Sequence, residues 1–192
     1  MTTLSDKYCI TGYTPKCKYE FISHLRKIIL KNWFQMIQLR SKHFSKNEYQ
    51  YITESIIDHA HEHNIRIILN SDMIDKSLYG ADGIHYTTNS ITKSNINENK
   101  SLIIGASCHN LKELILLNNI PMDYFFICPV LQTRSHPNKK PLGWKKFCQL
   151  ARKANSPVYA LGGLNSTHLS IAKYNGAYGI AGIESFWDNQ SI

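Results

Sequence analysis

The sequence lacks the features that stabilise secreted proteins or anchor proteins in membranes. Its five cysteines are an odd number, widely scattered, and include no C-x-x-C pair: they are Cys9, Cys17, Cys108, Cys128 and Cys148. We therefore expect reduced thiols rather than disulfides, a zinc site or a redox dithiol. No run of about 18 apolar residues is present, and the first residues lack the apolar stretch of a signal peptide. These absences predict a cytoplasmic protein with no membrane association.

The sequence also lacks a low-complexity linker and any long internal repeat, which would mark a domain boundary or a repeat architecture. A chain of 192 residues is long enough for one well-packed core but short for two domains. A hydrophobic content of 43% with 19% charged residues is ordinary for a globular protein. We therefore predict a single domain over residues 1–192.

Positive charge is in excess, with a formal net charge of +8 and a pI near 9.2. Basic stripes are typical of nucleic-acid binding, but here the lysines are spread along the chain and form only short pairs, at 139–140 and 145–146. No arginine-rich run or nucleic-acid motif is present. The charge balance therefore favours an anionic small molecule as the partner, and we expect no nucleic-acid binding.

Short β-rich runs alternate with amphipathic helical stretches along the whole chain, which is typical of βαβ units around a parallel sheet. Ser45 and Glu48 have the spacing of a helix-opening capping box. Eight strands in strict alternation predict a closed (β/α)8 TIM barrel of the α/β class. The predicted strands are 7–11, 36–40, 66–70, 83–86, 102–107, 124–128, 158–161 and 179–183, and the predicted helices are 19–31, 45–63, 73–79, 111–119, 143–154 and 166–175.

Polar residues gather where the predicted strands end, which is where active sites lie in such barrels. Each has an ordinary alternative: Arg40 and Lys42 as a solvated loop, Asn70 and Ser107 as helix caps, and Asp82 as a plain turn. Their accumulation on one rim favours a binding site. The residues concerned are Arg40, Lys42, Asn70, Asp72, Asp82, Ser107, His109, Thr133, Ser135 and His136.

Glycines follow the two last predicted strands, at Gly162, Gly163 and Gly182. Phosphates in these barrels commonly bind after strands seven and eight, where glycine lets backbone N–H groups approach an oxyanion. The alternative is that Gly162 and Gly163 only form a tight left-handed turn. We predict a phosphate site at these glycines.

Three histidines, His59, His61 and His63, lie near the end of the second predicted helix. His59 and His63 are four residues apart and could face one metal ion. No third ligand is identifiable nearby, and the helix dipole also favours histidine in a last turn. We therefore expect no metal site there.

The rim residues, taken in order, resemble those of the thiamine phosphate synthase family, which includes thiazole tautomerases (TenI-like proteins). The resemblance spans nearly the whole chain and also extends to the barrel module that follows some Nudix hydrolases, although no Nudix box is present. It implies a small phosphorylated thiamine precursor as ligand, and it suggests a homodimer and a separate Nudix hydrolase partner. The segments that carry it are QLRSK (38–42), LN (69–70), GADGIH (80–85), IGASCH (104–109), LGGL (161–164) and GAYGIA (176–181).

The resemblance implies roles for individual rim residues. Arg40 and Lys42 match the residues that hold a pyrophosphate in the synthases, and Asn70 matches the one that contacts the pyrimidine. Thr133 and Ser135 match hydroxyl residues of a loop that closes over the substrates.

The chain also departs from the synthase pattern. Two aspartates hold Mg²⁺ in the synthases; Asp82 is matched to one, while Ser71 stands in place of the other, with Asp72 one place later. His136 replaces the loop lysine, and Glu184 replaces a serine near the thiazole phosphate. Losing a carboxylate weakens a magnesium site unless Asp72 substitutes.

Thiazole tautomerases of the family lack that aspartate and shift a double bond by proton transfer, with a histidine matching His109. We therefore favour a tautomerase-like reaction on a thiazole carboxylate phosphate, without a cofactor, with His109 as acid or base beside Ser107. His109 could instead cap the helix that begins near Asn110. The alternatives are a synthase that joins hydroxymethylpyrimidine pyrophosphate to thiazole phosphate, with Mg²⁺ at Asp82 and Asp72, and a non-catalytic phosphometabolite-binding module.

Overall fold

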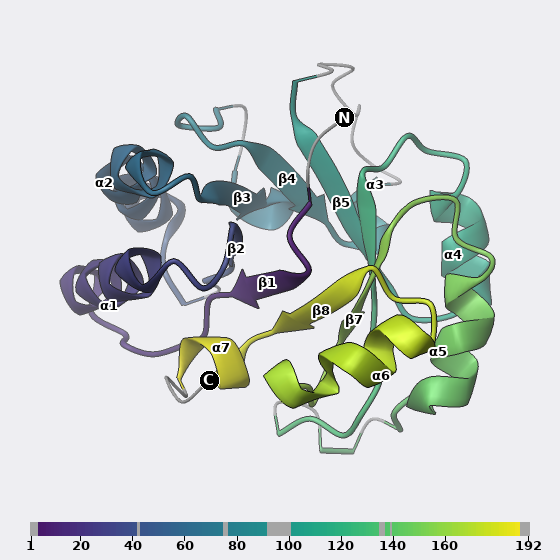
Figure 1. Ribbon diagram of the computed structural model, residues 1–192. Helices are drawn as coiled ribbons and strands as arrows, with labels where there is room; N and C mark the ends of the chain where they lie inside the picture. Colours follow the sequence, from purple (N-terminus) through teal and green to yellow (C-terminus); the bar gives the residue numbers. More distant parts are fainter. Residues whose placement is uncertain are drawn as a thin grey trace.

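Eight parallel strands form a closed barrel in the computed structural model, which describes residues 4–41, 43–74, 77–91, 101–134, 137–138 and 140–188. Each strand pairs with its neighbours in sequence, and β8 pairs with β1 to close the ring (Figure 1). The predicted (β/α)8 fold is confirmed, and each strand overlaps its predicted range. The strands are β1 (Lys7–Ile10), β2 (Met36–Leu39), β3 (Arg66–Asn70), β4 (Gly83–Tyr86), β5 (Ile103–Cys108), β6 (Tyr124–Ile127), β7 (Val158–Leu161) and β8 (Gly179–Gly182).

Helices surround the barrel on its outside (Figure 1). The capping box predicted at the start of α2 is present, since Ser45 Oγ accepts from the Glu48 N–H at 3.3 Å and the Glu48 carboxylate accepts from the Ser45 N–H at 3.0 Å. Among the described residues, no helix is long and apolar enough to cross a bilayer. The helices are α1 (Lys18–Lys31), α2 (Lys46–Glu62), α3 (Thr88–Ile91), α4 (Leu111–Leu117), α5 (Gly143–Ala151), α6 (Leu169–Tyr174) and α7 (Glu184–Trp187), with 3₁₀ turns η1 (Ser71–Met73) and η2 (Ser166–His168).

The prediction of a helix at 73–79 is wrong for the described residues of this range. The chain forms only the single turn η1 after β3. Ahead of β4 it passes through two consecutive left-handed residues, Tyr79 at φ 51° and Gly80 at φ 85°. Left-handed residues cannot continue a right-handed helix, so the local backbone stops any helix before this point.

Apolar side chains form two layers, one inside the barrel and one between the strands and the helices. Four aromatic rings fill the interior: Tyr8 lies edge-on to Tyr124, Phe126 and Tyr159, at centroid distances of 5.4, 5.0 and 5.5 Å. Gly105 makes room for them, since a Cβ there would lie 2.0 Å from the Tyr124 ring. The barrel is therefore a packed core rather than a channel.

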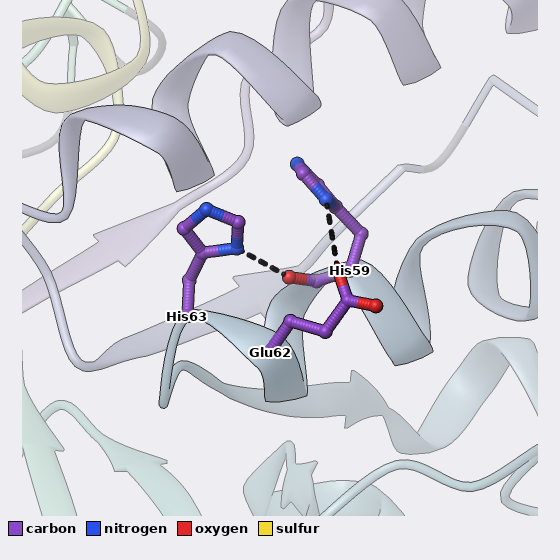
Figure 2. A group of neighbouring side chains, drawn as sticks. All are labelled: His59, Glu62 and His63. Atoms are coloured by element: carbon purple, nitrogen blue, oxygen red, sulfur yellow. Dashed lines mark hydrogen bonds and ion pairs between the residues drawn. The ribbon is translucent and has the colours of Figure 1, made fainter.

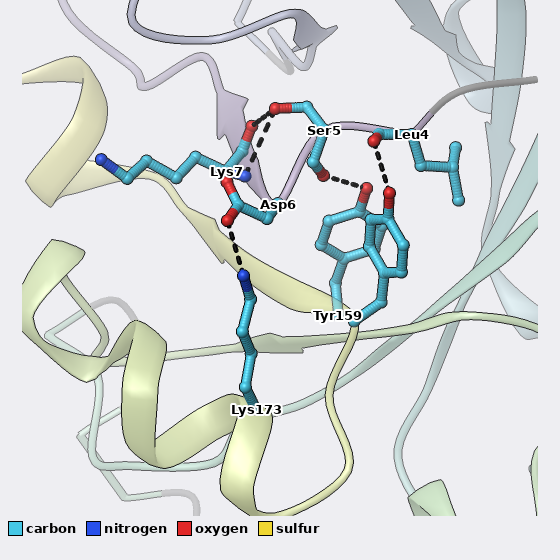
Figure 3. Close-up of polar contacts among 7 residues, drawn as sticks. Leu4, Ser5, Asp6, Lys7, Tyr159 and Lys173 are labelled. Atoms are coloured by element: carbon cyan, nitrogen blue, oxygen red, sulfur yellow. Dashed lines mark hydrogen bonds and ion pairs between the residues drawn. The ribbon is translucent and has the colours of Figure 1, made fainter.

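Polar contacts close the end of the barrel at which the strands begin (Figure 3). The Tyr159 hydroxyl donates to the Ser5 carbonyl oxygen, and the Ser5 hydroxyl donates to the Lys7 carbonyl oxygen at 2.9 Å. Lys173 Nζ lies 2.8 Å from Asp6 Oδ2 and ties α6 to the segment that leads into β1. Side chains available to bind a ligand are thus those at the opposite rim, where the strands end.

Asp82 lies at this closed end, which contradicts its prediction as a rim and magnesium residue. It precedes β4, and its carboxylate accepts from the Ile67 N–H at 2.8 Å, at the start of β3, and lies 3.1 Å from His61 Nε2. Asp123 makes the same kind of contact between β5 and β6. It directly precedes β6, and its carboxylate accepts from the Ile104 N–H near the start of β5 at 2.7 Å. Both aspartates join the beginnings of neighbouring strands and cannot share an ion with Asp72, which follows β3 at the rim.

Candidate functional site

A cavity of about 300 Å³ opens at the rim where the strands end. Two larger hollows, of about 500 and 430 Å³, lie at the closed end and on the outer surface of α1 and α2. The rim cavity is the candidate site because inward-facing polar side chains from several strands converge on it. Seven residues predicted from the sequence line it: Arg40, Asn70, Asp72, Ser107, His109, Thr133 and Gly162.

The remaining predicted residues have different positions. Gly163 and Gly182 adjoin the lining residues Gly162 and Ile183 without lining the cavity themselves. A Cβ on Gly182 would lie 2.9 Å from Phe186, so this glycine lets α7 pack against β8. Lys42, Ser135 and His136 lie outside the described residues.

The basic group in the cavity wall is Arg40, at the end of β2. Its backbone N–H donates to Thr11 Oγ1 at 2.8 Å, and its guanidinium donates to the Tyr13 hydroxyl at 2.8 Å and stacks over that ring. These contacts hold a permanent positive charge at the cavity mouth. Such a charge favours an anionic ligand such as a phosphate.

Two buried amides lie deeper, where Gln38 Nε2 donates to Asn70 Oδ1 at 3.3 Å. Asn70 precedes η1 but makes no capping hydrogen bond, so the interpretation of Asn70 as a helix cap is wrong. Its backbone N–H donates to the Tyr49 hydroxyl at 3.0 Å, which fixes the residue from behind. The Asn70 side chain is therefore held in the cavity wall as a polar recognition group.

A buried hydrogen-bonded chain leads from the barrel core to the cavity. The Tyr8 and Tyr124 hydroxyls lie 2.8 Å apart, Tyr124 contacts His85 Nδ1 at 3.0 Å, and His85 Nε2 contacts Ser107 Oγ at 2.8 Å. Ser107 therefore belongs to this chain rather than capping a helix. Tyr124 and Gln38 have no role predicted from the sequence; the signal that could have found them is a polar side chain at one of the alternate, inward-facing positions of a strand.

Burial and, to a smaller extent, the positive charge of Arg40 lower the pKa of His85 to about 3. The His85 imidazole is therefore neutral at neutral pH, with one nitrogen as donor and one as acceptor. Burial raises the pKa of the Tyr8 and Tyr124 phenols, which stay protonated. This series of hydrogen-bonded side chains can thus orient the Ser107 hydroxyl without carrying a net charge.

This lowered pKa predicts acid sensitivity. An unfolded histidine takes up its proton near pH 6.5, whereas folded His85 does so near pH 3, so the unfolded state binds the extra proton between these values. The contribution of His85 is complete above pH 6.5 and is lost as the pH falls towards 3. We expect His85→Gln to reduce the pH slope of the unfolding free energy by about 1.4 kcal/mol per pH unit between pH 6 and 4.

Urea unfolding at a series of pH values measures that slope. His168→Gln, at a histidine of the η2 turn, is the control for substitution of a histidine. Equal slopes in wild type and His85→Gln would show that His85 is not buried in neutral form.

His109 lies at the end of β5, with its ring in the cavity wall. Its Nδ1 is 2.7 Å from the Cys128 carbonyl oxygen, which can only accept, so Nδ1 carries the proton and Nε2 keeps the lone pair of the neutral ring. Asn110 caps α4, accepting from the Glu113 N–H at 3.0 Å, so the helix-cap interpretation of His109 is wrong. The geometry suits a proton acceptor at Nε2.

Gly162 and Gly163 do form the left-handed turn considered as their alternative role, with φ of 104° and 68°. A Cβ on Gly163 would lie 2.4 Å from the Gln132 carbonyl oxygen, so the loops after β6 and β7 touch through this glycine. Within the described part of the chain, neither glycine N–H donates to a backbone acceptor. The turn therefore leaves two donors beside the cavity for an anion.

Glu184 does not line the cavity. It begins α7, where a carboxylate suits the positive end of the helix dipole, and its Oε2 lies 3.9 Å from Arg134 Nε. Both side chains are well exposed, so the pair is weak. The Glu184 carboxylate thus lies outside the cavity in which we expect the phosphate to bind.

The described residues do not fit a two-carboxylate magnesium site. Asp72 is the single carboxylate among the described lining residues, and it is exposed. Ser71 Oγ lies 3.0 Å from Ser90 Oγ, so hydroxyls that are weaker ligands bond to each other beside it. Asp82 lies at the opposite end of the barrel, so the described residues that line the cavity include no pair of carboxylates.

Known proteins share this barrel along nearly its whole length. The profile of the thiamine monophosphate synthase family matches residues 7–186. A putative thiamine-phosphate synthase 2 from Aquifex aeolicus (strain VF5) is 32% identical over 176 residues, covering 90% of this chain and 94% of the relative. The chain belongs to the thiamine monophosphate synthase family.

Two further comparisons are at lower sequence identity. A thiamine-phosphate synthase from Methanococcus vannielii is 27% identical over 175 residues, covering 91% of this chain and 83% of the relative. A solved thiamine phosphate pyrophosphorylase from Pyrococcus furiosus shares the fold, with a TM-score of 0.73 at 22% identity over 93% of this chain and 85% of that chain.

The predicted family and its place in thiamine biosynthesis are therefore confirmed. The relatives are named as synthases, which favours the synthase over the tautomerase predicted from the sequence. A Nudix partner and a homodimer stay predictions.

Proposed function

We propose that the protein is a thiamine-phosphate synthase that joins hydroxymethylpyrimidine pyrophosphate to thiazole phosphate in the rim cavity. In this reaction the thiazole nitrogen forms a bond to the pyrimidine methylene carbon. The carbon–oxygen bond breaks and pyrophosphate leaves with the electron pair. The main support is the 32% identity to a putative thiamine-phosphate synthase over nine tenths of the chain.

The proposed binding roles follow the chemistry of the cavity wall. Arg40 binds the pyrophosphate with its fixed positive charge, and the Asn70 side chain contacts the pyrimidine. The Gly162 and Gly163 N–H groups bind the thiazole phosphate. Thr133 lines the cavity, and with Lys42, Ser135 and His136 it is proposed to contact the phosphates.

Magnesium takes no assigned step in this proposal, because the described carboxylates do not form a pair. Asp72 and the substrate's own phosphate oxygens are the ligands that the cavity would offer. Chelation with EDTA therefore tests whether the reaction depends on the metal.

A second candidate, tautomerase-like isomerisation of a thiazole carboxylate phosphate, is favoured by His109. Its Nδ1 proton is committed to the Cys128 carbonyl oxygen, so Nε2 is free to take a proton from the thiazole and return it to another atom of the ring system. The product is an isomer, so no leaving group or metal is required.

Assays of the purified protein separate the two candidates. We expect pyrophosphate and thiamine phosphate to appear in equal amounts from the two phosphorylated precursors, and Arg40→Gln to raise the KM for the pyrimidine pyrophosphate by roughly 10- to 100-fold, the value of one or more charged hydrogen bonds. Arg134→Gln, at an exposed arginine beside the cavity, is the control.

Each outcome of the assay is decisive. Isomerisation of the thiazole carboxylate phosphate without pyrophosphate release would replace the synthase by the tautomerase. Binding of the precursors with neither reaction would identify a non-catalytic binding module. Repeating the synthase assay with EDTA tests the metal: an unchanged rate would agree with the missing carboxylate pair.

A further inference from the structure

The C-terminal end of α2 carries a compact group of metal-binding side chains, far from the rim cavity. His59, Glu62 and His63 each offer one ligand atom, and these atoms all lie within 4.8 Å of one another (Figure 2). From the sequence no metal site is expected here, because no third ligand is apparent. The third ligand is Glu62, which is three residues after His59 and therefore on the same helix face.

A backbone hydrogen bond holds the His63 ring in place. Its Nδ1 lies 2.9 Å from the His59 carbonyl oxygen, so Nδ1 carries the proton and Nε2 keeps its lone pair. Metal-binding histidines commonly donate their other N–H to a backbone carbonyl in this way. The hydrogen bond also fixes the ring at the point where the helix ends.

The His59 ring has no hydrogen bond of its own among the described residues. Its Nδ1 faces Glu62 Oε2 at 3.8 Å, and its Nε2 is buried without a partner. The ring packs against His63 with centroids 4.6 Å apart, which holds it beside the carboxylate. The protein thus orients this imidazole without satisfying it.

The electrostatic surroundings favour a cation. Glu62 supplies a negative charge, and the carbonyl groups at the end of the 17-residue helix α2 supply the negative end of its dipole. Two imidazoles and one carboxylate suit Zn²⁺, Ni²⁺ or Cu²⁺ rather than Mg²⁺, which prefers oxygen ligands. Three protein ligands leave a fourth position for water.

We propose that His59, Glu62 and His63 form a binding site for a divalent transition-metal ion of the zinc class. The ion would bind at the last turn of α2, near the closed end of the barrel. It binds the folded state preferentially, because the three ligands have this spacing only when α2 is formed. Metal therefore stabilises the protein by linkage, independently of the reaction at the rim.

Titration of untagged, metal-free protein with Zn²⁺ tests the proposal by calorimetry and by the melting temperature. We expect one Zn²⁺ per chain, with Co²⁺ giving the absorption of a four-coordinate site. Glu62→Gln and His63→Ala should each weaken binding by about tenfold or more and abolish the metal-dependent rise in melting temperature.

His61→Ala is the matched control, since this histidine belongs to the same turn but contacts Asp82 on another side of the helix. It should bind Zn²⁺ as wild type does. Absence of saturable binding, equal loss in His61→Ala, or unchanged binding in both His63→Ala and Glu62→Gln would each overturn the proposal; the last would point to the cysteines instead. Glu62→Gln is nearly isosteric and exposed, so loss of folding should not obscure the result.

Discussion

If the protein isomerises thiazole carboxylate phosphate, we expect His109→Asn to lower the turnover by about 10² to 10⁴-fold, the usual range for losing a general acid or base, while substrate affinity changes little. Asparagine can keep a hydrogen bond to the Cys128 carbonyl oxygen, which His109 Nδ1 makes at 2.7 Å, but it cannot accept and return a proton. Single-turnover kinetics with the thiazole carboxylate phosphate separate the chemical step from binding.

The same variant distinguishes the two candidate functions. Pyrophosphate release requires no proton abstraction from the thiazole, so His109→Asn should change the synthase rate by less than about tenfold. His168→Asn, at a histidine that bonds to Asn165 in the η2 turn and does not line the rim cavity, should change neither reaction. Normal isomerisation by His109→Asn would reduce His109 to a structural residue and make His85 and His136 the next candidates.

We expect Gly163→Val to abolish binding of thiazole phosphate, with a loss of at least about 100-fold, because hydrogen bonds to charged groups are worth about 1.5–3 kcal/mol each. The backbone at Gly163 has φ 68°, and a Cβ there would lie 2.4 Å from the Gln132 carbonyl oxygen. The side chain would therefore displace the turn and withdraw its N–H donors. Calorimetry with thiazole phosphate, and separately with inorganic phosphate, measures the loss.

Gly176→Val controls for backbone strain. Gly176 has φ 91°, but a Cβ there would meet only Ala151, at 3.6 Å, outside the cavity. It should lose stability through the same left-handed conformation and keep its affinity for phosphate. Equal affinities in Gly163→Val and wild type would remove the glycine turn as the phosphate site, and equal losses in both variants would attribute the effect to folding.

Asp82 shows where reasoning along the chain failed. It is three residues before His85 and directly precedes β4, the short strand to which His85 belongs. A residue in a strand advances the chain by about 3.3 Å, so Asp82 lies roughly 10 Å before His85, at the end of the barrel where the strand begins. Closeness in sequence therefore misled the assignment of Asp82 to the rim. Once the limits of β4 are known, its direction places Asp82 at the end where the strands begin.

His59 and Glu62 show the complementary failure. Both residues and their helical spacing were visible in the sequence, but a carboxylate three residues after a histidine is common on exposed helices. Only the packed structure shows that the His59 ring faces Glu62 and that His63 is fixed by the His59 carbonyl oxygen. Side-chain rotamers depend on neighbouring elements, which a helical wheel does not include.

The sequence by itself determined the number and order of the strands, the start of α2 and the family, because hydrophobic periodicity, capping and local motifs act over a few residues. The tertiary structure alone decided which polar residues share the rim cavity, which nitrogen of His109 holds the proton and which end of the barrel holds Asp82. These properties depend on closure of the ring, which brings residues far apart in the chain into contact and separates neighbours across the length of a strand.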